Sequence, residues 1–285
     1  MSRASHRLGF ALVTASAVAW SLGGLFTRSI HVDGWTMLAW RGIFGALGLA
    51  LLMPFLPERR AWSMLRSMGW VGWLFVVQSA AGMVFYLSAL RHTSVANVAV
   101  IYATAPFLAA ALGWWALRER PSARALFASL VALAGVAVMV GFGGRGGLLG
   151  DALAFGMTAT MAVTMVVARN FPEVPILLTA CLSSLLSGVL CWPMGSPLAV
   201  GGRDLGLLAL FGIVNFVIGL PLFTMGARRL PPIETALIGA LDAPLAPLWV
   251  WLAFREIPSR STLIGGAVVF AAVSLHLVAA ESKPR

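Results

Sequence analysis

Charge and cysteine are both scarce in this sequence. Charged residues make up 11% of the 285 positions and apolar residues 60%, against about 25% and about 45–50% in typical soluble domains. The two cysteines, Cys181 and Cys191, fall in one apolar stretch, which excludes a disulfide framework and a thiolate metal site. A soluble chain of this length could not bury so much apolar surface, so we expect the surrounding solvent to be lipid.

The chemistry of enzymes and of ATP-driven pumps is also missing. The sequence has no P-loop pattern, and its four histidines show no metal-ligand spacing. It has no clustered acids for acid–base catalysis. We therefore expect no enzymatic activity, no metal, no cofactor and no nucleic-acid partner. The net charge of +10 is instead interpreted loop by loop, as a signal of orientation in a membrane.

Ten apolar runs are each long enough to cross a bilayer, which requires about 20 residues. They cover residues 8–28, 35–53, 68–90, 95–117, 123–140, 148–168, 175–192, 205–227, 232–254 and 263–280. The connections are short and carry proline, glycine or charged residues. The sequence thus predicts an all-α integral membrane protein with ten transmembrane helices and with its function inside the helix bundle.

Basic residues are distributed unequally between the two sets of loops. The N-terminus, the even-numbered loops and the C-terminus hold 13 of the 20 Lys and Arg residues, and the odd-numbered loops hold 6. Cytoplasmic segments carry the excess of basic residues in membrane proteins. We therefore expect both termini to be cytoplasmic, with the chain spanning a bacterial inner membrane.

Segments of the chain repeat about 137 residues apart. Residues 85–91 align with 222–228 and residues 118–122 with 255–259, while Arg28 matches Arg169 at a spacing of 141. Five helices per copy is an odd number, so the two copies must cross the membrane in opposite directions. We predict two inverted five-helix repeats, residues 1–143 and 144–285, with a substrate site near the membrane midplane between them.

Several of these short segments also carry a resemblance to a known family. They are Ala19-Trp20-Ser21, the segment around Arg41, residues 86–91 leading into Ala105-Pro106-Phe107, and residues 118–121 with their second copy. The chain resembles the drug/metabolite transporters of the ten-helix EamA type over nearly its whole length, and within them it looks most like the YddG aromatic amino acid exporters. The resemblance implies a basket-shaped bundle of two inverted halves that exports amino acids or related metabolites.

Two charged residues are predicted to lie within the hydrocarbon region. Asp242 is about ten residues into its helix, where it would contact a substrate amine or carry a coupling proton. Alternatively, it caps a helix break made by Pro244 and Pro247. Arg41 would meet a substrate carboxylate, but it lies close enough to its helix end to extend to the interface or to pair with backbone carbonyls. We therefore favour an orienting or structural role for Arg41, together with Pro106 and Pro244.

Uncharged polar residues recur at equivalent positions of the two copies. Gln78 and Asn215 are 137 residues apart, each in the middle of its helix. Each shares a helix face with a glycine and an aromatic residue, namely Gly82 with Tyr86, and Gly219 with Phe223. We predict that these two faces line a central cavity that the glycines keep open. The alternative is hydrogen bonding between helices, at about 0.6 kcal/mol per contact.

Aromatic residues inside the helices complete the predicted substrate site. Trp20, Tyr86 and Tyr102 would form an amphipathic wall for an apolar or aromatic side chain. Thr158 and Met161 are weaker candidates, Met161 being the repeat equivalent of Trp20.

Export of neutral or aromatic amino acids fits these features best. The expected partners are this small-molecule substrate and membrane lipid, and a single chain can enclose the cavity, so a monomer is compatible with the sequence. An anionic substrate would need more cations than Arg41 alone. A multidrug exporter of organic cations, a lipid-translocating protein and a passive channel remain open as alternatives.

Overall fold

The computed structural model describes residues 3–55, 65, 68–141, 147–171 and 174–281. This part of the chain is helical and contains no strand. Its main helices are α1 (Arg3–Ser21), α2 (Gly23–Ser29), α3 (Gly34–Leu52), α4 (Trp70–His92), α5 (Val95–Tyr102), α6 (Ala105–Leu117), α7 (Ala123–Val140), α8 (Leu148–Asn170), α9 (Ile176–Cys191), α10 (Gly202–Gly212), the π-helix η5 (Ile213–Gly219), α11 (Leu220–Ala227), α12 (Pro232–Gly239), α13 (Asp242–Phe254) and α14 (Arg260–Glu281). Short 3₁₀ turns cover Met53–Phe55, Trp192–Met194 and Pro197–Ala199.

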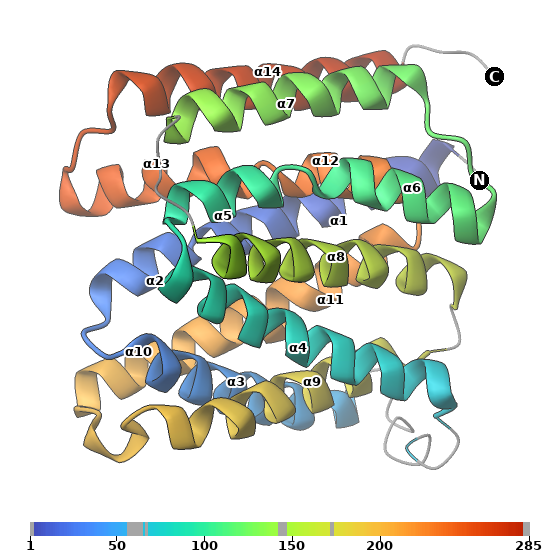
Figure 1. Cartoon of the computed structure of the whole chain (residues 1–285). Coiled ribbons are helices and arrows are strands. Elements are labelled where there is room, and N and C mark those ends of the chain that lie inside the picture. The colour runs from blue at the N-terminus through green and yellow to red at the C-terminus, as the bar shows by residue number, and fades with distance from the viewer. Residues whose placement is uncertain (1–2, 56–64, 66–67, 142–146, 172–173, 282–285) are drawn as a thin grey trace.

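Ten spans in the described residues are long and apolar enough to cross a membrane. Five of them combine shorter elements: α1 with α2, α5 with α6, α9 with the 3₁₀ turn Trp192–Met194, α10 with η5 and α11, and α12 with α13. The helices run roughly side by side, and the start of α1 and the end of α14 lie at the same end of the bundle (Figure 1). We call that end the termini face and the other end the opposite face. The prediction of ten helices in two inverted repeats is confirmed.

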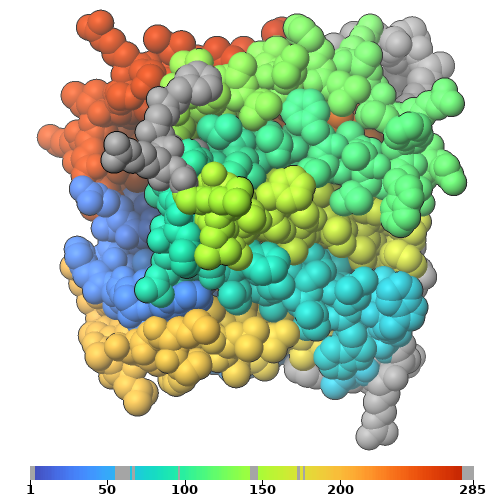
Figure 2. Space-filling view, viewed as in Figure 1, coloured from blue at the N-terminus to red at the C-terminus, as the bar shows by residue number. Residues whose placement is uncertain are grey.

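The two halves interleave rather than standing apart. Equivalent helices pack against each other at the edges of the bundle, α3 on α9 and α7 on α14. Between them α1 packs on η5 and α11, and α8 packs on α4 and α6. Figure 2 shows one result on the surface, where α8 of the second half lies between α6 and α4 of the first. A path between the halves is therefore lined by helices of both.

Glycine permits the closest of these contacts. A Cβ on Gly42 of α3 would lie only 2.5 Å from the Ser184 carbonyl oxygen of α9 and 2.9 Å from the Gly188 Cα. Small residues at such positions let helix backbones approach in a membrane, where packing replaces the hydrophobic driving force. The α3–α9 pair is thus held at backbone distance.

The fourth and ninth spans are interrupted at equivalent places. The α5–α6 break falls at residues 103–104, and the α12–α13 break falls at residues 240–241. In each break a hydrogen bond from residue i to residue i−3 tightens the backbone, from the Thr104 N–H to the Ile101 carbonyl and from the Leu241 N–H to the Ile238 carbonyl, both 3.0 Å. The repeat in the sequence is therefore reproduced in the backbone at this level of detail.

Proline explains why both helices break here. Pro106 lies in the first turn of α6 and Pro244 in the first turn of α13. Proline lacks the N–H that would continue the preceding helix, but it fits a first helical turn, where that donor has no helical partner. The structural role predicted for both prolines agrees with these positions.

Two other spans are irregular in only one copy. The first span is interrupted at Leu22, directly before Gly23 and Gly24, whereas its equivalent α8 is continuous. The eighth span contains the π-helix η5 before Pro221, whereas its equivalent α4 is a regular α-helix. Glycine weakens a helix and proline removes a donor, so these residues account for the difference between the halves.

The interruptions converge on one part of the core. A single buried cluster contains Ala17 of α1, Ala103 and Ala105 beside the first break and Leu241 beside the second. Trp20 packs against the same cluster. The two helix breaks and the first span therefore border a common buried region, as in transporters whose substrate sites use discontinuous helices.

Candidate functional site at the helix breaks

Asp242 begins α13 at the second helix break. The backbone N–H of the next residue, Ala243, donates to the Ala240 carbonyl oxygen at 3.3 Å, and Asp242 lies in the first turn of the half-helix that also contains Pro244. In the described residues no basic side-chain nitrogen lies within 4.0 Å of this carboxylate. Gly239, three residues earlier, borders open space, since no atom lies within 4 Å of the position of an added Cβ. The carboxylate therefore lies at the start of a half-helix, three residues along the chain from open space at Gly239.

Arg41 lies deep in the bundle, so the expectation that it extends to the interface is wrong, whereas its orienting or structural role stays a prediction. Only 8% of its surface is exposed. Its guanidinium carbon is 5.1 Å from the ring centre of Phe211 and 5.4 Å from that of Phe216, and Nη2 contacts the Met83 sulfur at 3.0 Å. Packing of α9, α10 and η5 against α3 blocks the route that a shallow arginine would take to the membrane surface.

The Arg41 side chain has unused bonding capacity. Its buried Nε has no hydrogen-bond partner, and no carboxylate of the described residues comes within 4.0 Å of its guanidinium. The aromatic faces attract the guanidinium cation. They accept no hydrogen bonds from its N–H groups, which point outward in the plane of the guanidinium. The guanidinium is therefore equipped to receive an anion.

The two tyrosines link these charges. Tyr86 interacts electrostatically with both Arg41 and Asp242, and Tyr102 interacts with Asp242 and with Tyr86. Tyr102 ends α5 at the first break. Tyr86 is 40% exposed, and because the charges beside it belong to the bundle interior, we interpret this exposed surface as facing the interior. Tyr86 therefore connects the two charges, while Tyr102 lies on the side of Asp242.

Trp20 joins this region through the π-helix. Its indole Nε1 donates to the Asn215 carbonyl oxygen at 3.2 Å, and its ring lies 4.8 Å from that of Phe223. The same carbonyl accepts the Leu220 N–H, the bond that forms the π turn. The Asn215 side-chain nitrogen is buried without a partner. Single π turns inside helices are frequent at functional sites.

Gln78, the repeat equivalent of Asn215, makes the hydrogen bond between helices that was considered for it, whereas its role in lining a cavity stays a prediction. Its Nε2 donates to the Thr164 hydroxyl at 2.8 Å, which is a hydrogen bond between α4 and α8. Its Oε1 is buried and has no partner. Gln78 and Asn215 thus each leave one polar atom free in the interior, where an unpaired group is costly unless a ligand or water satisfies it.

The glycines beside these amides do not keep a cavity open, so that part of the prediction is wrong. A Cβ on Gly82 would lie 2.5 Å from the Thr160 hydroxyl, and a Cβ on Gly219 would lie 2.5 Å from the Trp20 Nε1. Both glycines instead make room for a side chain of the neighbouring helix. Spacing along the sequence places residues on one face but does not reveal how closely the next helix approaches.

The two candidates on α8 lie in packed surroundings. Thr158 is fully buried, and its hydroxyl donates to the Ala154 carbonyl oxygen at 2.8 Å. Met161 packs against the same core cluster as its repeat equivalent Trp20. The structure therefore brings Met161 to the edge of the region described above and gives Thr158 a contact within its own helix.

Comparison with known proteins assigns the chain to a family. The EamA-like transporter family matches two segments, residues 7–141 and 148–278. The chain belongs to this family. Its members are transporters, which implies a multi-pass membrane transporter of small molecules rather than an enzyme. The family match leaves the substrate open.

Structural similarity agrees with the fold of this family. One solved structure, titled only as the crystal structure of a protein, has a TM-score of 0.78 and 22% identity, with 98% of this chain and 100% of that chain covered. At this identity the likeness concerns the fold alone. In all, 29 chains of solved structures match, whereas no curated protein sequence does.

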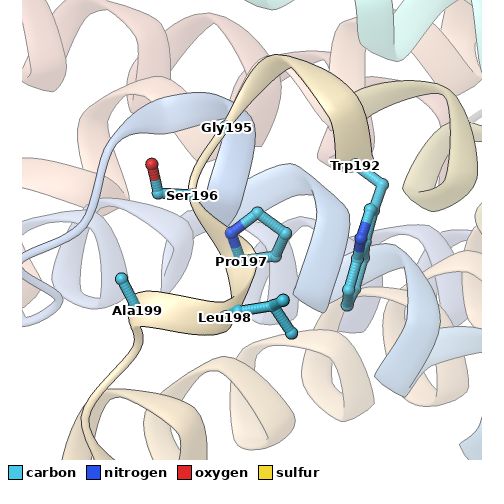
Figure 3. A pocket seen from close by; sticks show the side chains of 6 residues that line it. All are labelled: Trp192, Gly195, Ser196, Pro197, Leu198 and Ala199. Carbon is cyan, nitrogen blue, oxygen red and sulfur yellow. The ribbon is translucent and has the colours of Figure 1, made fainter.

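A surface pocket of this EamA-type chain lies away from the helix breaks. It has a volume of about 340 Å³ and is lined by Trp192 and residues 195–199, in the loop between α9 and α10 (Figure 3). It presents a proline, an indole and small side chains but no charged group. Such a lining offers nothing to bind an ionic substrate, so the interior region remains the candidate transport site.

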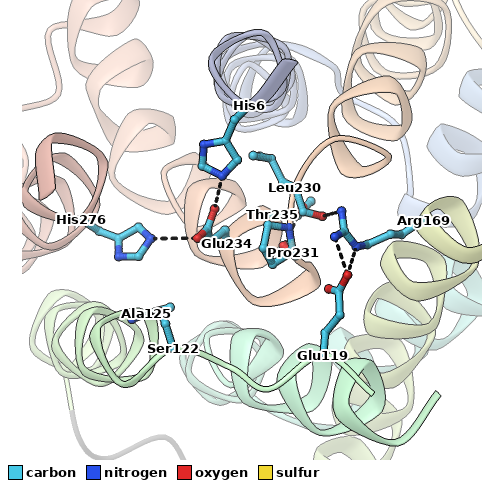
Figure 4. Close-up of polar contacts among 10 residues, drawn as sticks. All are labelled: His6, Glu119, Ser122, Ala125, Arg169, Leu230, Pro231, Glu234, Thr235 and His276. Atoms are coloured by element: carbon cyan, nitrogen blue, oxygen red, sulfur yellow. Dashed lines mark hydrogen bonds and ion pairs between the residues drawn. The ribbon is translucent and has the colours of Figure 1, made fainter. Parts of the chain in front are cut away.

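Ion pairs at the termini face were not among the predicted site residues. At the termini face Arg169 binds Glu119 and the Leu230 carbonyl oxygen, and Glu234 lies between two histidines (Figure 4). Glu234 is 3.0 Å from the Nε2 of His6 and 3.7 Å from that of His276. The sequence contained a signal for the first pair, because Arg169 and Glu119 both recur in the other repeat.

Proposed function

We propose that the protein exports neutral amino acids, the aromatic ones foremost, from the cytoplasm across a bacterial inner membrane by alternating access between its two halves. The observation that carries this proposal is a pair of opposite charges inside an aromatic interior, neither of which has an ionic partner within the described ranges. Arg41 supplies the cation and Asp242 the anion, and Tyr86 interacts with both.

An isolated charge in a low-dielectric interior is unfavourable until it is paired. A substrate carboxylate would meet the guanidinium of Arg41 in the fork geometry that arginine favours, and a substrate ammonium would meet Asp242. A neutral amino acid carries one group of each kind. Its net charge of zero matches the sum of the two site charges.

The walls of the region support an apolar or aromatic side chain. Trp20 presents an indole already packed against Phe223, and Tyr86 and Tyr102 carry hydroxyls beside apolar rings. Such amphipathic rings form ligand pockets that are mostly apolar with a few oriented polar groups. The free amide atoms of Gln78 and Asn215 would add hydrogen bonds to a polar substrate.

Export of organic cations is the second candidate, because Asp242 alone would serve a cation. Arg41 argues against it, since a buried positive charge repels a cationic substrate. Translocation of lipid or passive conduction would require neither charge. All three alternatives are outcomes of the same flux measurement.

The test is flux in proteoliposomes that contain only this protein, with labelled tryptophan, phenylalanine, threonine and glutamate. We expect saturable movement of tryptophan and phenylalanine that exceeds movement of glutamate, and a change when a pH gradient is imposed if transport is proton-coupled. Absence of flux for all four amino acids would refute the proposal and favour an organic cation or a lipid.

Competition separates the two charged contacts. Tryptamine lacks the carboxylate and indole-3-propionate lacks the amine, so Arg41→Gln should weaken tryptophan but spare tryptamine, and Asp242→Asn should weaken tryptophan but spare indole-3-propionate. Loss of a charged hydrogen bond corresponds to about a tenfold change or more in affinity. Arg203→Gln, at an exposed arginine of α10, is the matched control. Equal weakening of all three ligands by both variants would refute the zwitterion assignment.

A further inference from the structure

We propose that two ion pairs, Arg28–Glu256 at the opposite face and Arg169–Glu119 at the termini face, are the two gates of the transport path. Each pair would hold one end of the bundle closed and break when that end opens. The proposal depends on alternating access, which is part of the proposed function, but it does not depend on the identity of the substrate.

The two ion pairs are equivalent, because each residue of one pair occupies the position in its repeat that a residue of the other pair occupies in the other repeat. Arg28 and Arg169 are equivalent at a spacing of 141, and Glu119 and Glu256 at a spacing of 137. Each pair joins an arginine of one half to a glutamate of the other. A contact that crosses between the halves at one end of the bundle therefore has a copy that crosses between them at the other end.

The two pairs also share their bonding geometry. In both, the arginine Nε and Nη2 donate to a single glutamate oxygen, Oε1. For Arg28 and Glu256 the distances are 3.2 Å from Nε and 2.5 Å from Nη2. For Arg169 and Glu119 the Nε distance is 2.8 Å, and Nη2 donates to the same oxygen. The symmetry thus extends from the sequence to individual atoms.

An unusual backbone conformation positions both glutamates. Arg118 and Arg255 directly precede them and end α6 and α13 in the left-handed region, with φ of 56° and 58°. They are the non-glycine residues with positive φ in the described part of the chain. A side chain in this region carries a cost, and here the conformation reverses the chain so that the next residue meets the other half.

The arginine ends of the pairs differ between the two faces. Arg28 lies on α2, a seven-residue segment separated from α1 by the interruption at Leu22, and its side chain is 60% exposed. Arg169 lies on the continuous helix α8, is 16% exposed, and also donates to the Leu230 carbonyl oxygen at 2.8 Å. The termini-face gate is thus the more firmly held in this structure, and the opposite-face gate opens first.

Accessibility of the interior from each side tests this assignment. Gly239→Cys places a thiol in open space beside the second helix break, while the native Cys181 and Cys191 are buried. The thiol is labelled with a membrane-impermeant maleimide in right-side-out and in inverted vesicles, with the protein lacking Gly239→Cys as the background. Labelling from each face reports which end is open, without any substrate.

Mirror-image changes are expected from the two gates. Glu256→Gln should raise labelling from the opposite face by about two- to fivefold, in line with a solvent-exposed pair, and lower it from the termini face. Glu119→Gln should do the reverse. Arg203→Gln and Arg124→Gln, exposed arginines near the opposite and termini faces, are the matched controls and should change neither.

Charge exchange makes the test specific. The double variant Arg28→Glu with Glu256→Arg restores the pair in reverse order and should return labelling to the starting level. Labelling that changes in the same direction in both single variants, or that stays unchanged in both, would overturn the gate assignment even if amino acids are transported. Mirror-image labelling without amino acid flux would instead support the gates and refute the proposed substrate.

Discussion

Gly219→Ala provides a sharp test of how the interior is packed. The added Cβ would lie 2.5 Å from Nε1 and 2.7 Å from Cδ1 of Trp20, and 3.2 Å from the Val214 carbonyl oxygen. The indole has little freedom to move, because it donates to the Asn215 carbonyl and packs against Phe223. We expect the substitution to displace Trp20 and to break that hydrogen bond.

The expected change in the free energy of unfolding follows from two opposing contributions. Overpacking a well-filled interior costs about 1–3 kcal/mol, and replacing glycine by alanine in a helix returns up to about 1 kcal/mol. The net destabilisation of Gly219→Ala is therefore about 1–2 kcal/mol. At the equivalent Gly82 the close atom is the Thr160 hydroxyl, which rotates away more easily than an indole, so Gly82→Ala should cost less than about 1 kcal/mol.

The assay is thermal unfolding of the purified protein in detergent, combined with tryptophan flux in proteoliposomes. Trp20→Leu removes the indole, so the cost of Gly219→Ala should fall when both substitutions are present, which gives a coupling free energy of about 1 kcal/mol. If Gly219→Ala were neutral, or additive with Trp20→Leu, the glycine would border open space after all. The packing argument would then be refuted.

Three other predictions concern single side chains. Asp242→Asn should remove the dependence of flux on an imposed pH gradient if this carboxylate carries the coupling proton, and unchanged dependence in reconstituted protein would exclude that role. Gln78→Leu should reduce tryptophan flux at least tenfold while changing stability by less than about 1 kcal/mol, because the side-chain carbonyl oxygen of Gln78 is already unpartnered. Unchanged flux would show that Gln78 serves packing alone. At the start of α3, burial raises the pKa of Asp33, but hydrogen bonds led by those from Thr36 outweigh this and leave the pKa below its usual value. The contribution of Asp33 to stability is therefore present above about pH 4 and declines as the pH falls through the lowered pKa. Asp33→Ala should cost about 1 kcal/mol of stability at neutral pH, whereas Asp33→Asn should keep the helix cap and lose the pH dependence. Thermal unfolding measures both effects.

The fold was largely predictable because membrane spanning leaves few choices. Runs of about 20 apolar residues must form helices in lipid, and an odd number of them per repeat requires inversion. Only the break in the ninth span was predicted, from Pro244 and Pro247; it falls just before Asp242, and Pro247 lies inside α13 without interrupting it. These features depend on local chemistry, so a sequence without its structure is enough to locate them.

How deeply a side chain is buried depends on which other helices pack against it, and the sequence alone does not give that arrangement. Arg41 is six residues from the start of its run, and an arginine at that depth on an isolated helix would extend to the interface. In the structure Phe211 and Phe216, 170 or more residues away, lie over its guanidinium. The same limitation applies to Gly82 and Gly219, whose partners belong to other helices.

The differences between the two repeats carry information that their similarities do not. Pro221 of the eighth span corresponds to Val84 of α4, and Gly23 and Gly24 correspond to Thr164 and Met165 of the unbroken α8. A proline or a glycine pair in one copy alone weakens one helix of an otherwise matched set. Both irregular spans meet where Trp20 bonds to Asn215, and one of them carries Arg28. Regular helices move as rigid bodies, so relative motion concentrates at irregular positions such as these. We therefore expect the hinge of the opposite-face gate at the contact between the first and eighth spans.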